Sequence, residues 1–141
     1  CEELTDTVVI ILADHGHIKV DNIYLKDYPD ICSLMERTTS IEQRAVSFKI
    51  KENQHKLFEE RFNHYFSEYF SLYSKEEIID SRIFGDGKVH ENFEYAIGDF
   101  IAIAESSNKC LLTDGDFPMF SHHAGYTDEE LYVPLIIVDR V

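Results

Sequence analysis

A short run of aliphatic and β-branched residues near the start of the sequence constrains the fold more than any other feature. Residues 7–13 read TVVIILA, and the chain turns polar immediately afterwards at Asp14, His15 and Gly16. An unbroken apolar run of this length is typical of a strand buried on both faces, as in a parallel sheet under helices. Ligand sites in open α/β sheets gather at the carboxyl ends of strands, where this polar triplet lies. The run therefore predicts a buried strand with a candidate site at its end.

The rest of the chain alternates between patterns typical of strands and of helices. Aromatic residues at spacings of three and four predict a helix over residues 54–69 with a stripe that faces the core. Ser74 and Glu77 form the pattern of a capping box, which predicts a second helix over 75–82. Residues 21–43 are expected to form loops with a helical turn near 33–37. Further strands are predicted at 45–50, 70–73, 99–104, 110–113 and 133–138, the pair 99–104 and 110–113 as a hairpin.

Composition excludes several classes of partner. The chain has 27 acidic and 13 basic residues and a net charge of −14, so it would repel the phosphate backbone of a nucleic-acid polymer. A small anionic substrate stays compatible, because bound cations can reverse the local field. No apolar run is long enough to cross a membrane. Three cysteines without close spacing (Cys1, Cys32 and Cys110) indicate reduced thiols in a cytoplasmic protein rather than a disulfide framework.

Two clusters carry candidate metal chemistry. Asp14 and His15 lie in the turn after a strand, where adjacent side chains can converge on one ion, and Gly16 lets the backbone turn. The alternative is a polar turn without a ligand. His122 and His123 lie in a loop that leads into the last strand, and they too can supply a ligand or form an exposed loop. His17 follows the first cluster, but no spacing requires it as a ligand.

Together, the two segments resemble the alkaline phosphatase superfamily, in particular its type I phosphodiesterase and nucleotide pyrophosphatase branch. They read DTVVIILADHGH (6–17) and SHHAGYTDEELYVPLIIV (121–138). The first is similar to the family strand that ends in Asp-His-Gly. The second is similar to the family's metal-binding histidine, followed by a small residue, a glycine, an acidic turn and a Val-Pro-Leu strand. The resemblance covers both ends of the chain.

The resemblance implies a two-metal site that hydrolyses small-molecule phosphate esters. Asp14 and His15 would bind one divalent ion and His123 the second, with zinc preferred to manganese. His122 would support His123, or would be the ligand itself if the register is shifted by one residue. A metal-binding Asp, a Thr or Ser nucleophile, and an Asp and His spaced four apart have no counterpart here. We therefore expect the C-terminal portion of a larger enzyme, with no catalytic nucleophile of its own and inactive in isolation.

On this basis we expect residues 1–141 to form part of a three-layer α/β/α fold of the alkaline phosphatase type with a mostly parallel sheet. Residues 44–82 are predicted to be a small α/β insert, or cap, within it. A sheet cut in this way exposes an edge, which predicts self-association into homo-oligomers. The alternatives are a phosphomonoesterase or phosphotransferase of the same superfamily, or a non-catalytic module that binds a partner through 44–82.

Overall fold

A four-stranded antiparallel sheet forms the centre of the computed structural model, which describes residues 6–113 and 115–140. Its strands lie in the order β4-β5-β7-β6. They comprise β4 (Ser40–Glu42), β5 (Ala45–Phe48), β6 (Ser71–Ser74) and β7 (Phe100–Ile103). The strands predicted at 45–50, 70–73 and 99–104 are confirmed, with ends shifted by one or two residues. Strands β5 and β6 lie within residues 44–82 and β4 and β7 lie outside them, yet all four belong to one sheet. The boundaries of the predicted insert stay a prediction.

The aromatic helix packs on one face of this sheet. Helix α2 (His55–Phe66) places Phe58, Phe62 and Phe66 in the core, each with 0% exposure, so the core-facing stripe is confirmed for the phenylalanines. The ring of Phe48 on β5 lies 5.5 Å from that of Phe62, in an edge-to-face arrangement. Tyr65, another aromatic residue within the predicted range 54–69, is exposed instead.

Two shorter helices cover the opposite face. Helix α3 (Lys75–Ser81) begins with the predicted capping box, and α4 (Phe93–Ile97) packs beside it. Successive side chains of a strand point to opposite faces, and both faces of β7 are covered. Phe100 and Ala102 therefore lie in the cluster with α2, whereas Ile101 and Ile103 lie in the cluster with α3 and α4. This alternation explains why all four residues of β7 are buried.

Two small sheets lie beside the central one. Strands β3 (Asp21–Tyr24) and β8 (Lys109–Leu112) pair in parallel, and β2 (Ile18–Lys19) pairs antiparallel with β9 (Ser121–His122). The hairpin predicted between 99–104 and 110–113 is wrong, because β8 takes β3 as its partner. The helical turn is also displaced: η1 (Leu25–Asp27) and α1 (Pro29–Cys32) precede the predicted position near 33–37.

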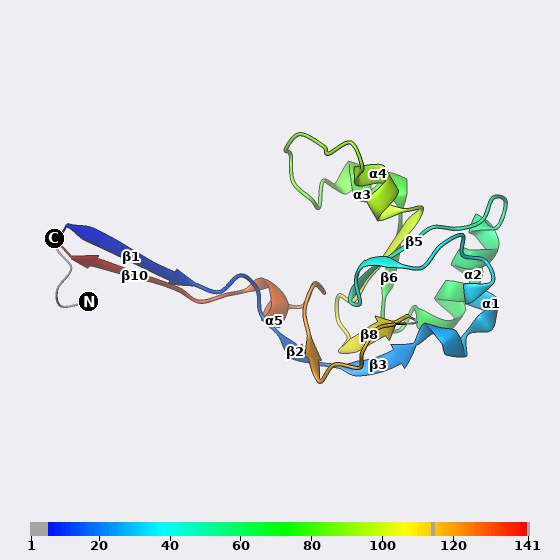
Figure 1. The fold of residues 1–141 in the computed structure, drawn as a ribbon, viewed down its shortest axis with the longest axis horizontal. Coiled ribbons are helices and arrows are strands. Elements are labelled where there is room, and N and C mark those ends of the chain that lie inside the picture. Colours follow the sequence, from blue (N-terminus) through cyan, green and yellow to red (C-terminus); the bar gives the residue numbers. More distant parts are fainter. Residues whose placement is uncertain (1–5, 114, 141) are drawn as a thin grey trace.

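The first and last strands form a ribbon that projects from the rest of the molecule (Figure 1). Strand β1 (Thr7–Leu12) pairs antiparallel with β10 (Leu135–Arg140), which follows the short helix α5 (Asp128–Leu131). The expectation of a buried strand in a parallel sheet is wrong here, since Ile10 is 57% exposed. Only β3 and β8 are parallel among the described residues, so the α/β class is confirmed but a mostly parallel three-layer sheet is not. Among the residues described, no helix is both long and apolar enough to span a membrane.

Candidate metal centre

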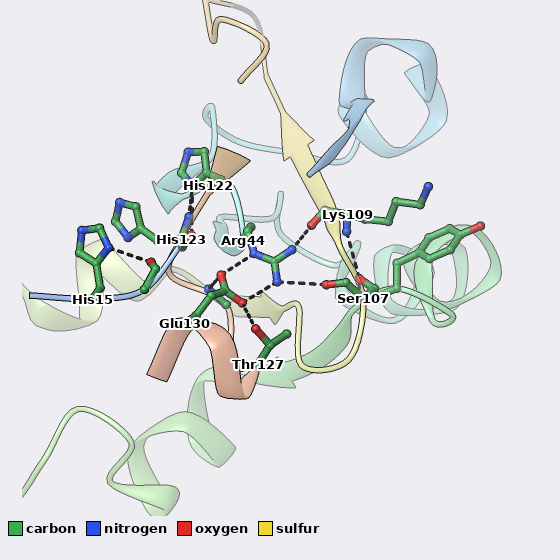
Figure 2. Close-up of polar contacts among 11 residues, drawn as sticks. His15, Arg44, Ser107, Lys109, His122, His123, Thr127 and Glu130 are labelled. Atoms are coloured by element: carbon green, nitrogen blue, oxygen red, sulfur yellow. Dashed lines mark hydrogen bonds and ion pairs between the residues drawn. The ribbon is translucent and has the colours of Figure 1, made fainter. Parts of the chain in front are cut away.

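The two polar clusters from opposite ends of the sequence meet where the ribbon joins the rest of the molecule. The pairing of Ile18 on β2 with His122 on β9 fixes the two loops side by side. As a result the rings of His15 and His123 stack, with centroids 3.8 Å apart and planes inclined by 13°. Figure 2 shows both rings next to that of His122. The structure therefore brings together the two histidines that the motifs singled out.

His15 has the environment of a metal-binding histidine. Its Nδ1 lies 2.9 Å from the carbonyl oxygen of Gly16, and its Nε2 lies 3.4 Å from a carboxylate oxygen of Asp14. Metal-bound histidines commonly donate one ring N–H to a carbonyl and offer the other nitrogen to the ion. A tetrahedral zinc with bonds of about 2.0–2.1 Å needs ligand atoms about 3.3 Å apart, so Asp14 and His15 fit one ion.

Asp14 differs from the neighbouring histidines, because its side chain is largely exposed to solvent. The pKa of the Asp14 carboxyl is lowered by a hydrogen bond from its own backbone N–H, by the electrostatic interaction with the neighbouring His15 ring, and by a hydrogen bond from the backbone N–H of His15. The carboxylate is therefore ionised at neutral pH, which is the state that binds a cation.

His123 lies between His15 and His122. Burial first, and then the proximity of His15, lower the pKa of His123, so its imidazole is neutral and available as a ligand. His122 is buried on β9, and its Nδ1 lies 3.0 Å from both the backbone nitrogen and the carbonyl oxygen of His123. The structure thus places His123 against His15, and His122 behind it.

Two further groups lie near the centre that the sequence predictions did not assign as ligands. His17 lies with His15 and His123, and its ring centroid is 5.0 and 5.1 Å from theirs. Glu42 at the end of β4 offers a carboxylate oxygen within 4.8 Å of ring nitrogens of His122 and His123. Nothing in the sequence pattern connects Glu42 to the histidines, because β4 is distant from both motifs in the chain.

A buried ion pair links helix α5 to the central sheet next to the candidate metal centre. Arg44, just before β5, forms a bidentate pair with Glu130 of α5, with N···O distances of 2.6 and 2.7 Å and side chains 0% and 1% exposed. The guanidinium also donates to the carbonyl oxygens of Ser107 and Lys109 (Figure 2). Burial alone would raise the pKa of Glu130, but hydrogen bonds from Arg44, Thr127 and the Gly125 backbone lower it. Both groups are therefore charged, as a satisfied buried pair requires.

Glu130 contacts both loops that carry the candidate ligands His15 and His123, through Gly16 in the first loop and Gly125 in the second. Its carbonyl oxygen accepts from the Gly16 N–H at 3.0 Å, and its carboxylate accepts from the Gly125 N–H at 2.8 Å. A Cβ on Gly16 would lie 1.8 Å from the carbonyl oxygen of Glu129, and one on Gly125 would lie 2.5 Å from Arg44. The reason for glycine is thus close packing rather than a sharp turn: against the backbone of α5 at Gly16, and against the Arg44–Glu130 pair and the Ala104 carbonyl at Gly125.

The mixed α/β fold of this chain resembles a portion of the fold of solved nucleotide pyrophosphatase/phosphodiesterase structures. The solved structures that it resembles include human ectonucleotide pyrophosphatase/phosphodiesterase 5, with a TM-score of 0.64 and 17% identity over 94% of this chain and 34% of that one. They also include the murine protein, with a TM-score of 0.59 and 16% identity over 93% and 34%. An inactive variant of the murine protein in complex with AMP matches equally well, over 93% and 33%.

The chain thus spans about one third of the length of these proteins. No protein-family model matches its sequence, and no curated protein sequence matches it. The resemblance to a portion of a nucleotide pyrophosphatase/phosphodiesterase is confirmed at the level of the fold.

Proposed function

We propose that this chain is the C-terminal portion of a metal-dependent phosphoric ester hydrolase of the phosphodiesterase and nucleotide pyrophosphatase kind. The observation that carries the proposal is the contact between His15 and His123, whose rings stack at 3.8 Å although they come from opposite ends of the sequence. These are the histidines that the family motifs assign to two neighbouring metal ions. The likeness of the fold to phosphodiesterase structures supports the same assignment.

In this proposal the chain supplies ligands for two divalent cations. Asp14 and His15 would bind one ion and His123 the other, with His122 behind it as its neighbour. Carboxylate and imidazole ligands suit zinc, and manganese also accepts them. When bound, two such ions neutralise phosphate oxygens and stabilise the attacking and leaving groups of a displacement. Ligands of this kind would let a chain with a net charge of −14 hold an anionic substrate.

The substrate class proposed is a small phosphate ester, such as a nucleotide derivative. The murine structure in complex with AMP supports this choice, since that protein has the same fold over the matched region. The nucleophile and the remaining metal ligands are proposed to lie in a part of the enzyme that these 141 residues do not include.

The chain by itself is therefore expected to be inactive. The assay measures hydrolysis of aryl phosphate monoesters and diesters by the 141-residue chain with Zn²⁺ or Mn²⁺, beside a His123→Ala variant. Equal, background rates are expected. Turnover by the unaltered chain above that of the variant would show that a nucleophile is already present, and would overturn the proposed division of the site.

The coding sequence that precedes Cys1 tests the enzyme assignment itself. It should encode a strand followed by Thr or Ser, and later an Asp with a His four residues on. A protein that includes this segment should hydrolyse the diester, and His123→Ala should lower kcat/KM by about tenfold or more. His64→Ala, which alters an exposed histidine on α2, is the control and should leave activity unchanged. A preceding segment without these residues would instead favour a module that binds a partner.

A further inference from the structure

Glu42 brings a carboxylate to the metal centre from a part of the chain that is distant from both motifs. One of its carboxylate oxygens and one ring nitrogen each of His122 and His123 all lie within 4.8 Å of one another. Within residues 6–113 and 115–140, no lysine, arginine or backbone N–H pairs with this carboxylate. A metal cation is the group that accepts a carboxylate and an imidazole together as ligands.

The buried ion pair also determines where Glu42 lies. Glu42 is the last residue of β4, and Arg44 lies in the turn that leads to β5. Arg44 binds Glu130, whose carboxylate accepts from the N–H of Gly125, two residues after His123. The strand that carries Glu42 and the loop that carries His123 are therefore held next to each other by the fold itself.

The arrangement of the stacked histidines favours two neighbouring ions rather than one. The rings of His15 and His123 lie 3.8 Å apart and their planes are inclined by only 13°. An imidazole binds a metal in the plane of its ring, so nearly parallel rings direct their nitrogens to separate positions. The ions of two-metal sites lie about 3.5–4 Å apart, close to the separation of these rings. The proposed function gives Asp14 and His15 to one ion, which leaves His123 on the other.

We propose that Glu42 is a direct ligand of the divalent ion that His123 binds. Each of the two ions then receives one carboxylate and one imidazole from this chain, a combination that zinc and manganese accept. Ligand atoms on one tetrahedral zinc lie about 3.3 Å apart, so Glu42 and His123 must close by roughly 1.5 Å at most. Rotation about the side-chain bonds of Glu42 can provide this movement while β4 stays in place.

The inference rests on the proposed function, because it completes the ligands that this chain gives to one of its two ions. It goes further by placing the second carboxylate on β4, outside the segments that carry the family resemblance. Loss of Glu42 should therefore weaken the ion of His123 and leave the ion of Asp14 and His15 in place.

The experiment is a Zn²⁺ titration of the 141-residue chain, followed by the NMR resonances of the His15 and His123 rings. The variants are Glu42→Gln and, as a matched control, Glu52→Gln, which alters an exposed glutamate. The His123 resonances of Glu42→Gln should need at least about tenfold more Zn²⁺, since even loss of an outer-shell partner costs about 10- to 100-fold in metal affinity. The His15 resonances, and both histidines in Glu52→Gln, should respond as in the unaltered chain. Far-UV circular dichroism verifies that each variant is folded.

If His123 responded to the same Zn²⁺ concentration in Glu42→Gln and Glu52→Gln, Glu42 would not be a ligand, and the ligand division of the proposed function would still stand. Equal weakening at His15 and His123 in Glu42→Gln would indicate a general disturbance of the centre and would also overturn the inference. If neither histidine responded to Zn²⁺ in the unaltered chain, the inference and the proposed function would fail together.

Discussion

The central sheet with its helices and the β1–β10 ribbon are built from similar apolar residues, yet they bury them very differently. In the central region Phe62 and its neighbours on α2 are completely buried between helix and sheet. In the ribbon, Ile10 and Ile11 on β1 and Ile136 on β10 are each more than half exposed (Figure 1). An apolar strand therefore acquires a core only when a second layer covers it. Two strands alone leave both faces open.

A substitution in each region tests this difference most directly. Phe62→Ala should lower the free energy of unfolding by about 3–5 kcal/mol, because it leaves a cavity in a closely packed core. Ile11→Ala should change it by only about 0.5 kcal/mol, because the side chain is 54% exposed. Urea unfolding followed by circular dichroism measures both. A large cost at Ile11 would mean that the ribbon is covered in solution.

Glu130 connects the two regions through its contacts with Gly16, Gly125 and Arg44. Among substitutions of polar residues, Glu130→Gln should lower the free energy of unfolding most. It leaves Arg44 buried without its counter-charge, which costs about 3–5 kcal/mol in comparable sites. Glu129→Gln alters the exposed neighbour on α5 and is the matched control, with an expected change of about 0.5 kcal/mol at most. Urea unfolding at pH 7 compares the two variants.

The pH dependence of stability independently tests how much the charge of Glu130 contributes to folding. The pKa of Glu130 is lowered by folding, so its stabilising contribution is complete above the unfolded pKa of about 4.3–4.5. It is lost as the pH falls through the lower pKa of the folded state. The unaltered chain should therefore lose stability below about pH 4.5 more steeply than Glu130→Gln. If the free energy of unfolding of the two proteins fell in parallel as the pH was lowered, a charged Glu130 would be contradicted.

Substitution of Gly16 at the junction should cost less stability than Glu130→Gln but more than substitution of an exposed glycine such as Gly87. Gly16→Ala places a Cβ against the carbonyl of Glu129, and forcing the two apart should cost about 1–3 kcal/mol. Gly87→Ala is the control, because a Cβ there meets nothing within 4 Å. Thermal unfolding of both variants measures the difference. Equal melting temperatures would show that the loop carrying His15 can move away from α5 freely.

The smallest effect on folding is expected from a charge on the ribbon, which should act on association instead. We predict that the chain self-associates through the exposed ribbon, and that Ile10→Lys weakens this association with little change in unfolding. Ile79→Lys, at an exposed isoleucine on α3, is the control. Light scattering over a range of concentrations measures the mass. A monomer at high concentration for the unaltered chain would contradict the prediction.

Local sequence patterns were sufficient to predict several helices and the candidate site residues. The spacing of the phenylalanines determined α2 and its buried face, because a helix repeats every 3.6 residues whatever surrounds it. Ser74 and Glu77 determined the start of α3, because a capping box is complete within four residues. The two motifs likewise pointed to His15 and His123, which the structure places in contact.

Features that depend on residues distant in the chain were not predictable from local patterns. An apolar run such as β1 is compatible with a buried parallel strand or an exposed ribbon, and its partner makes the choice. Strand β8 pairs with β3 rather than β7 for the same reason. Arg44 and Glu130 are 86 residues apart, and nothing local to either indicates the other. The sequence by itself determined which residue types could form a metal centre. The pairing of β2 with β9 and the buried ion pair decided that they meet, and that Glu42 lies beside them.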